Sequence, residues 1–208
     1  MDDNMVEDLF TGSYKTEQIA QKLLGRLLVH ETAEGRTSGF IVETEAYLGV
    51  LDMAAHSYGA RRTKRTEAMF QAPGTIYVYV MHTHALLNLI TQEIGNPEGI
   101  LIRAIEPYEG TDLMTSRRQK QGFQLTNGPG NLTKAMGVNK EQYGKSIFSS
   151  DLFINPIIRR DPVQVATSPR IGIPNKGIWT DHPLRYYVAG NPYVSRRKGM
   201  IDSNYGWK

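Results

Sequence analysis

Hydrophobic and polar positions follow one another in short segments that predict a mixture of helices and strands. Apolar residues recur at helical spacing over residues 16–24, with a threonine as candidate cap at the start and Gly25 as candidate stop. Residues 27–30 and 38–47 are typical of strands, and a turn at residues 34–36 joins them into a hairpin. The domain therefore opens with one amphipathic helix followed by a β-hairpin.

The rest of the chain continues in short segments separated by turn signals. Residues 49–65 are polar, basic and glycine-containing, which predicts a loop, and Pro73-Gly74 predicts a turn. The further predicted elements are a short helix at 64–70, strands at 75–80 and 99–105, a helix at 109–120, a loop at 127–130 with a short helix to Met136, and strands and turns that include 170–174 and 184–188. We predict one α+β domain over residues 16–208, preceded by an acidic, flexible tail over residues 1–15.

Composition and charge narrow the class of protein. Of the 208 residues, 40% are hydrophobic and 22% charged, as in ordinary globular proteins, and the absence of cysteine excludes disulfides and thiolate chemistry. No apolar run approaches the roughly 20 residues that a membrane span needs, and the acidic start is unlike a targeting signal. We expect a cytoplasmic protein, associated with the nucleoid if the source is bacterial, with no membrane contact.

The net charge of +3 is unevenly distributed, because the chain after its first eight residues is distinctly basic. Four of the 21 acidic residues lie in the first eight positions, which leaves 17 acidic residues against 24 basic ones in the remainder. Basic residues gather at 61–65, 117–120 and 196–198. Several such clusters on one domain predict a face that binds phosphate.

Two predicted strands carry side chains suited to chemistry. Alternation along the first strand places three of them on one side: Glu43, Glu45 and Tyr47. Alternation along the second does the same for Thr75, Tyr77 and Tyr79. The two strands could wall a pocket with phenol rings and place a carboxylate at its rim, which suits a flat, electron-poor ring. On geometry alone either glutamate could be the acting carboxylate.

Other residues add or exclude chemistry. Arg103 lies between apolar neighbours in its strand, so it needs a partner, for which Glu45 and Glu106 are candidates. His82 and His84 are too few for a metal site, which needs three or four convergent ligands. Phosphate-loop, dinucleotide and nucleophilic-serine motifs do not occur. We expect no metal and no other cofactor.

These motifs together resemble the alkyladenine (3-methyladenine) DNA glycosylase family. The similarity runs from about Thr16 to Ser195 and is carried by residues 41–49, 54–57, 69–70, 73–79, 88, 101–107, 127–129, 170–172 and 183–188. It implies a single mixed α/β domain with a curved, largely antiparallel sheet and a protruding hairpin that enters the DNA minor groove. It also implies a monofunctional, monomeric enzyme that excises damaged purines from double-stranded DNA and leaves an abasic site.

The resemblance assigns roles to matching residues. Glu45 would be the carboxylate that activates water, and Arg103 with the backbone of Ile171 would help to hold that water. The flipped base would be enclosed by Tyr47, His56, Tyr79, Leu101, Ile171 and Asn88. Among these, the asparagine would disfavour the exocyclic amino group of normal guanine.

The chain departs from the family after Tyr79, where a tyrosine-glycine pair usually follows and one residue is missing here. The wedge that fills the vacated place in the base stack is therefore Met81 or His82. Either side chain stacks over less area than a tyrosine, and base-aromatic stacking is worth about 1–3 kcal/mol. We expect excision to favour cationic, poorly paired lesions.

The leading hypothesis is a DNA repair glycosylase that acts on 3-methyladenine and 7-methylguanine, with hypoxanthine and ethenoadenine as further candidates. Neutral lesions need a proton on the leaving base, from His56 or from water. Two alternatives remain: a hydrolase of free nucleosides, which would not need the basic face, and a non-catalytic module for distorted DNA, which would not need Glu45.

Overall fold

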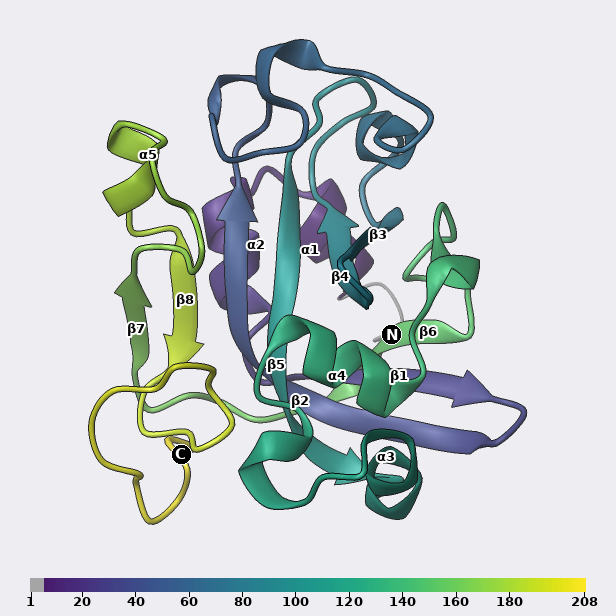
Figure 1. Ribbon diagram of the computed structural model, residues 1–208, viewed down its shortest axis with the longest axis vertical. Helices are drawn as coiled ribbons and strands as arrows, with labels where there is room; N and C mark the ends of the chain where they lie inside the picture. Colours follow the sequence, from purple (N-terminus) through teal and green to yellow (C-terminus); the bar gives the residue numbers. More distant parts are fainter. Residues whose placement is uncertain (1–5) are drawn as a thin grey trace.

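One antiparallel sheet of eight strands organises the chain in the computed structural model, which describes residues 6–208 (Figure 1). The strands are β1 (Arg26–Thr32), β2 (Gly35–Tyr47), β3 (Ile76–Met81), β4 (His84–Ile90), β5 (Gly99–Glu109), β6 (Leu152–Arg159), β7 (Val165–Ser168) and β8 (Arg185–Val188). Their order is β3-β4-β5-β2-β1-β6, with β8 paired to β2 and β7 paired to β8. The predicted α+β fold around a largely antiparallel sheet is confirmed.

Strand β2 is the centre of this arrangement and bends along its length (Figure 1). It pairs with β5 along one edge, and with β1 and then β8 along the other. Its register with β5 shifts on both sides of Glu43, which marks local irregularities of the ladder. The half of β2 that carries the glutamates therefore lies between two strands from distant parts of the chain, β5 and β8.

Short helices complete the fold. They are α1 (Glu7–Thr11), α2 (Thr16–Lys22), α3 (Thr111–Arg118), α4 (Pro129–Met136), α5 (Ile178–Asp181) and the 3₁₀ turns η1 (Gly49–Leu51), η2 (Tyr58–Ala60), η3 (Glu67–Phe70), η4 (Gly122–Leu125) and η5 (Lys140–Gln142). Helix α2 packs on β2, and α4 packs on β4 and β5. One large core joins these elements, while a smaller cluster of Ala68, Met69, Phe70, Tyr77 and Ile90 lies beside β3.

Helix α2 starts differently from the sequence expectation. Lys15 occupies the cap position, and the side chain of Gln18 accepts from its backbone N–H at 2.9 Å. Thr16 is instead buried, where its hydroxyl contacts Oγ1 of Thr91 at 2.7 Å and Oε2 of Glu98 at 2.6 Å. The predicted threonine cap is wrong because tertiary contacts take its hydroxyl. Gly25, with φ of 82°, follows the helix as predicted.

Part of the expected amino-terminal tail is packed. Residues 1–5 lie outside the described part of the chain. Helix α1 follows, and its Leu9 and Phe10 belong to the main core, where Phe10 meets the edge of Phe148 with ring centroids 5.5 Å apart. With the buried Val6, these apolar residues among acidic neighbours anchor the segment to the core.

Some helices and strands also begin or end at other residues than the sequence pattern predicted. The helix expected at 64–70 is the 3₁₀ turn η3, which starts at Glu67, and the helix expected at 109–120 is shorter, as α3. Strand β4 was not predicted from the residues alone. Residues 170–174 form no strand and instead cross beside the end of β2, where Ile171 meets Glu45.

Strands β3 and β4 form a tight hairpin. Met81 pairs with His84 across it, so His82 and Thr83 make a two-residue turn in which His82 has φ of 54°. Helix α4 supports the hairpin, because an added Cβ on Gly130 would lie 2.8 Å from the Cβ of His84. Only glycine permits this close approach.

Candidate active site

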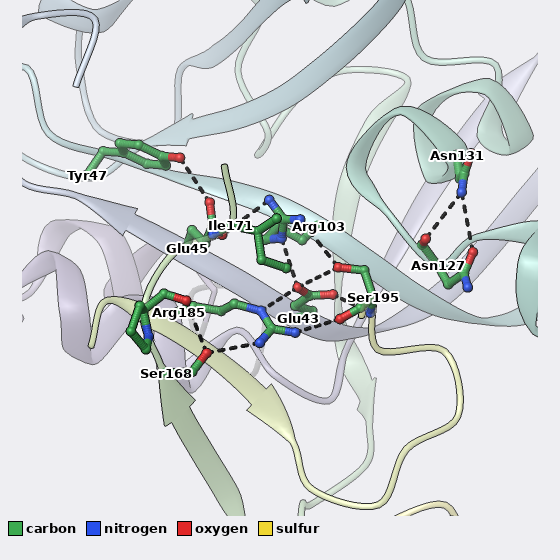
Figure 2. Close-up of polar contacts among 11 residues, drawn as sticks. Glu43, Glu45, Tyr47, Arg103, Asn127, Asn131, Ser168, Ile171, Arg185 and Ser195 are labelled. Atoms are coloured by element: carbon green, nitrogen blue, oxygen red, sulfur yellow. Dashed lines mark hydrogen bonds and ion pairs between the residues drawn. The ribbon is translucent and has the colours of Figure 1, made fainter. Parts of the chain in front are cut away.

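Glu45 lies near the end of β2 and is completely buried, with donors around its carboxylate (Figure 2). Its Oε1 accepts from the backbone N–H of Ile171 at 2.7 Å and lies 3.2 Å from Nη1 of Arg103. Its Oε2 accepts from the hydroxyl of Tyr47 at 2.9 Å. A carboxylate has about four acceptor positions. No fourth donor from residues 6–208 reaches Glu45, so Oε2 keeps a position for one further donor.

Glu43 is equally buried and accepts from four donors, three of them on Oε1. Its Oε1 accepts from Nε of Arg103 at 2.8 Å, from Nε of Arg185 at 2.7 Å and from Oγ of Ser195 at 2.8 Å. Its Oε2 accepts from the backbone N–H of Ser195 at 2.7 Å. Both glutamates contact Arg103, so they share a face of β2, yet their donors distinguish them.

The surroundings of Glu45 change its basicity. Burial raises the pKa of the Glu45 carboxyl, because the ionised form loses hydration in the interior. The charge of Arg103 and the hydrogen bonds from Ile171 and Tyr47 lower that pKa, while the charge of Glu43 raises it, and the net direction is upward. The carboxylate of Glu45 is therefore a stronger base than that of an exposed glutamate.

An aromatic cavity of about 160 Å³ shares Tyr47 with this carboxylate. The structure places four residues expected in the base pocket around the cavity: Tyr47, His56, Tyr79 and Asn88. Met81 from the hairpin lines it as well, as does Tyr77, whose strand was expected to wall a pocket. Ile173 also lines it, and the sequence did not single out this residue. Carboxylate and cavity are therefore neighbours.

Two further residues expected in the pocket lie differently. Leu101 is outside the residues that line the cavity, because it is buried in β5 opposite both Glu45 and Asn88 in the sheet register. Ile171 contributes its backbone N–H to Glu45, and Ile173 takes the lining position. Two residues of this segment thus serve the site, Ile171 through its backbone N–H to the carboxylate and Ile173 as part of the cavity lining.

The cavity wall is a set of packed rings. His56 meets Tyr79 edge-on with centroids 4.4 Å apart, and Tyr77 stacks on Tyr79 at 5.8 Å. Nδ1 of His56 lies 2.9 Å from the hydroxyl of Tyr77. Burial, then the charges of Arg65 and Arg61, lower the pKa of His56, while burial raises the pKa of Tyr77 and of Tyr79 to about 12. At neutral pH the imidazole is therefore neutral and both phenols keep their protons.

The chain matches the family described as Methylpurine-DNA glycosylase (MPG) over residues 10–192. It belongs to that family. A protein of Enterococcus faecalis named "Putative 3-methyladenine DNA glycosylase" is 57% identical over 196 residues, which cover 93% of this chain and 86% of the other. Proteins of the same name from Listeria monocytogenes and Bacillus velezensis are 50% identical over 207 residues and 56% identical over 180 residues. These matches cover 98% and 86% of this chain, and 99% and 91% of the two relatives. The predicted family is confirmed.

A buried ion pair holds the segment that brings Ile171 to Glu45 in this glycosylase-family chain. Both guanidinium Nη atoms of Arg170 contact Asp52, at 2.5 Å and 2.9 Å, and both side chains are fully buried. The Arg170 guanidinium also lies 4.6 Å from the centre of the Tyr47 ring. Sequence reasoning missed Asp52, although Arg170 lies in a stretch that matched the family.

The three basic clusters have different surroundings. Lys64 and Arg65 line a groove that shares Tyr79 with the aromatic cavity. The cluster at 196–198 directly follows Ser195, which binds Glu43. In the third cluster, Arg117 and Arg118 donate to backbone carbonyls, so these two residues serve the fold. Two of the three clusters therefore adjoin the site.

Residues 6–208 contain no group of three or more side chains placed to hold a metal ion. The same part of the chain has no helix that is long and apolar enough to cross a membrane.

Proposed function

We propose that this protein is a DNA repair glycosylase that hydrolyses the N-glycosidic bond of alkylated purines in double-stranded DNA. One observation carries the proposal: Glu45 is buried, has one open acceptor position and touches Tyr47, which lines the aromatic cavity. A water that donates to Oε2 would lie beside a base held in that cavity. The substrates that fit best are 3-methyladenine and 7-methylguanine, with hypoxanthine and ethenoadenine as further candidates.

Recognition follows from the chemistry of the cavity. A glycosylase cannot reach the bond inside the stack, so it rotates the nucleotide outward at a cost of a few kcal/mol, which is lowest for poorly paired bases. A cationic purine gains about 0.5–2 kcal/mol from each ring face it meets. The rings of Tyr47, Tyr79 and His56 supply such surfaces. Bonds from Nδ2 to the carbonyls of Tyr77 and Leu86 hold Asn88 on the cavity wall, where its side chain occupies the space that the amino group of guanine would need.

Cleavage uses Glu45 as the base. The bond between C1′ and the base nitrogen breaks, the electron pair leaves with the base, and water oxygen bonds to C1′ while its proton passes to Glu45. The carboxylate also stabilises the positive charge that develops on the sugar. Arg103 and the Ile171 N–H act by fixing Oε1 of this carboxylate. The products are free base and an abasic site, without strand scission.

Neutral lesions need a proton on the departing base. His56 is neutral at neutral pH because burial lowers its pKa, so it offers a hydrogen bond and no ionised acid. We therefore propose water as the source of this proton.

The hairpin provides the wedge, and Met81 is the residue that fills the vacated stack. Its side chain lines the cavity and is 50% exposed, so it is next to the place that the base leaves. His82 belongs to the turn and not to the cavity lining. The basic clusters at 61–65 and 196–198 contact the phosphates of the bound DNA. The protein acts as a monomer.

Release of free base decides the function. A short duplex with one 3-methyladenine and the corresponding free nucleoside are incubated with the protein, and released base is quantified by chromatography. We expect release from the duplex alone, reduced by about 10²–10⁴-fold in Glu45→Gln, the range typical of a lost general base. Equal release from the nucleoside would indicate a nucleoside hydrolase. Duplex binding without release would indicate a binding module.

A further inference from the structure

Glu43 is the most densely bonded buried charge in the neighbourhood of Glu45, although the proposed reaction does not use it. Figure 2 shows it between two guanidinium groups, with Arg103 on one side and Arg185 on the other. Ser195 closes the network through its backbone N–H and its hydroxyl. Burying so many charges together is costly unless each one is paired. The arrangement therefore needs an explanation beyond simple stability.

Arg103 is divided between the two glutamates. Its Nε binds Glu43 at 2.8 Å, its Nη1 lies 3.2 Å from Glu45, and its Nη2 donates to Oγ of Ser195 at 3.3 Å. A guanidinium is planar and rigid, so fixing Nε and Nη2 also fixes where Nη1 points. Glu43 and Ser195 thus set the contact between Arg103 and Glu45. The shorter of the two ion pairs is the one with Glu43.

The charge of Glu43 also affects Glu45. Arg103 and Arg185 bring two buried positive charges to a site with two buried carboxylates. Without Glu43, both positive charges would act on Glu45 alone. The ionised form of Glu45 would then be stabilised, and an overstabilised carboxylate is a poor acceptor for a proton from water.

We propose that Glu43 is a positioning residue: with Ser195 it orients Arg103, and its charge offsets Arg103 and Arg185 so that Glu45 remains basic. This inference rests on the proposed function for its catalytic consequence. It also makes a statement about the free protein, which can be tested without DNA. Glu43 contacts neither the cavity nor the reacting atoms in this role.

The charge of Glu43 is tested with Glu43→Gln, which keeps the shape of the side chain. The other charged and titratable groups around Glu45 are unchanged in this variant: Arg103, Tyr47 and Tyr79, with Arg185 opposite Glu45 in the sheet register. We expect the acid limb of the single-turnover pH profile to move to lower pH by about one unit, the lower end of the effect of a nearby charge. The plateau rate should fall, because a weaker base accepts the proton.

Glu106→Gln is the matched control. Glu106 is also a buried carboxylate of the same sheet, and it accepts from Arg160, Asn191 and Trp207. It lies outside the network of Glu43. This variant should lose stability to a similar degree while its acid limb stays at the wild-type position.

Ser195→Ala separates orientation from charge. It removes the hydroxyl that contacts both Glu43 and Arg103, while the charge of Glu43 and the backbone donor remain. We expect a plateau rate roughly tenfold lower, since small misplacements of catalytic groups are costly, without the move of the acid limb to lower pH that marks Glu43→Gln. An unchanged plateau rate would overturn the orienting role, and this variant keeps the test open if Glu43→Gln fails to fold.

Carbon-13 NMR of labelled glutamate carboxyls distinguishes failure of this inference from failure of the proposed function. The titration of Glu45 in the free protein should shift to lower pH in Glu43→Gln, whether or not the protein excises bases. An unmoved titration would overturn the charge role. Loss of activity at every pH in Glu43→Gln, together with an active Glu45→Gln, would overturn it as well by making Glu43 the base.

Discussion

Removing the hydroxyl of Tyr47 tests how the buried carboxylate is held. In Tyr47→Phe the ring that lines the cavity remains, while the 2.9 Å hydrogen bond to Oε2 of Glu45 is lost. Burial, then the charge of Glu45, raise the pKa of Tyr47 well above its usual value, so this hydroxyl is a donor at every pH of the assay. Its loss removes one of three donors that stabilise the ionised form of Glu45.

The size of the effect follows from the charge of the acceptor. A hydrogen bond to a charged group contributes about 1.5–3 kcal/mol, and one pKa unit corresponds to about 1.36 kcal/mol. The pKa of Glu45 should therefore rise by roughly one to two units, with little solvent screening because the group is fully buried. Excision needs the ionised form, so activity should disappear at a higher pH than in the wild type as the solution is acidified.

Single-turnover excision of 3-methyladenine from a duplex, followed across acidic and neutral pH, measures this shift. Tyr79→Phe is the control, because Tyr79 lines the same cavity and no hydrogen bond from its hydroxyl to Glu45 occurs. The two variants should have similar plateau rates, with only Tyr47→Phe moving the acid limb upward. An acid limb that stays in place in Tyr47→Phe, or that moves equally in both variants, would refute the proposed role of this bond.

Three further perturbations test other parts of the site. Asn88→Ala should increase release of normal guanine from mismatched duplexes, because the cavity gains space beside the base edge, and an unchanged rate would leave Asn88 with a structural role. Met81→Tyr should raise extrusion of a fluorescent purine, because base-aromatic stacking is worth about 1–3 kcal/mol, whereas a larger gain in His82→Tyr would move the wedge to the turn. Asp52→Asn leaves Arg170 buried with a broken ion pair, so urea unfolding should show a loss of about 3–5 kcal/mol. Glu67→Gln, in an exposed pair, should lose much less.

Much of the fold could be predicted from the chain, because its signals are local. The strand at 38–47 and the short helix that ends at Met136 depend on alternation, helical spacing and flanking turn residues, all of which lie within one segment. Predictions failed where a distant contact overrode a local preference. Thr16 is the example, because Thr91 and Glu98 take the hydroxyl that a helix cap would have used.

The site divides in the same way. The sequence by itself determined the family and placed Glu43, Glu45 and Tyr47 on one face of a strand, since alternation is a property of the backbone. It could not say which glutamate meets Tyr47 of the cavity and which is held by two arginines and a serine. That depends on donors 126 residues away for Glu45, and 142 and 152 residues away for Glu43. Only the tertiary structure brings these donors together, because hydrogen bonds act over about 3 Å whatever the separation along the chain.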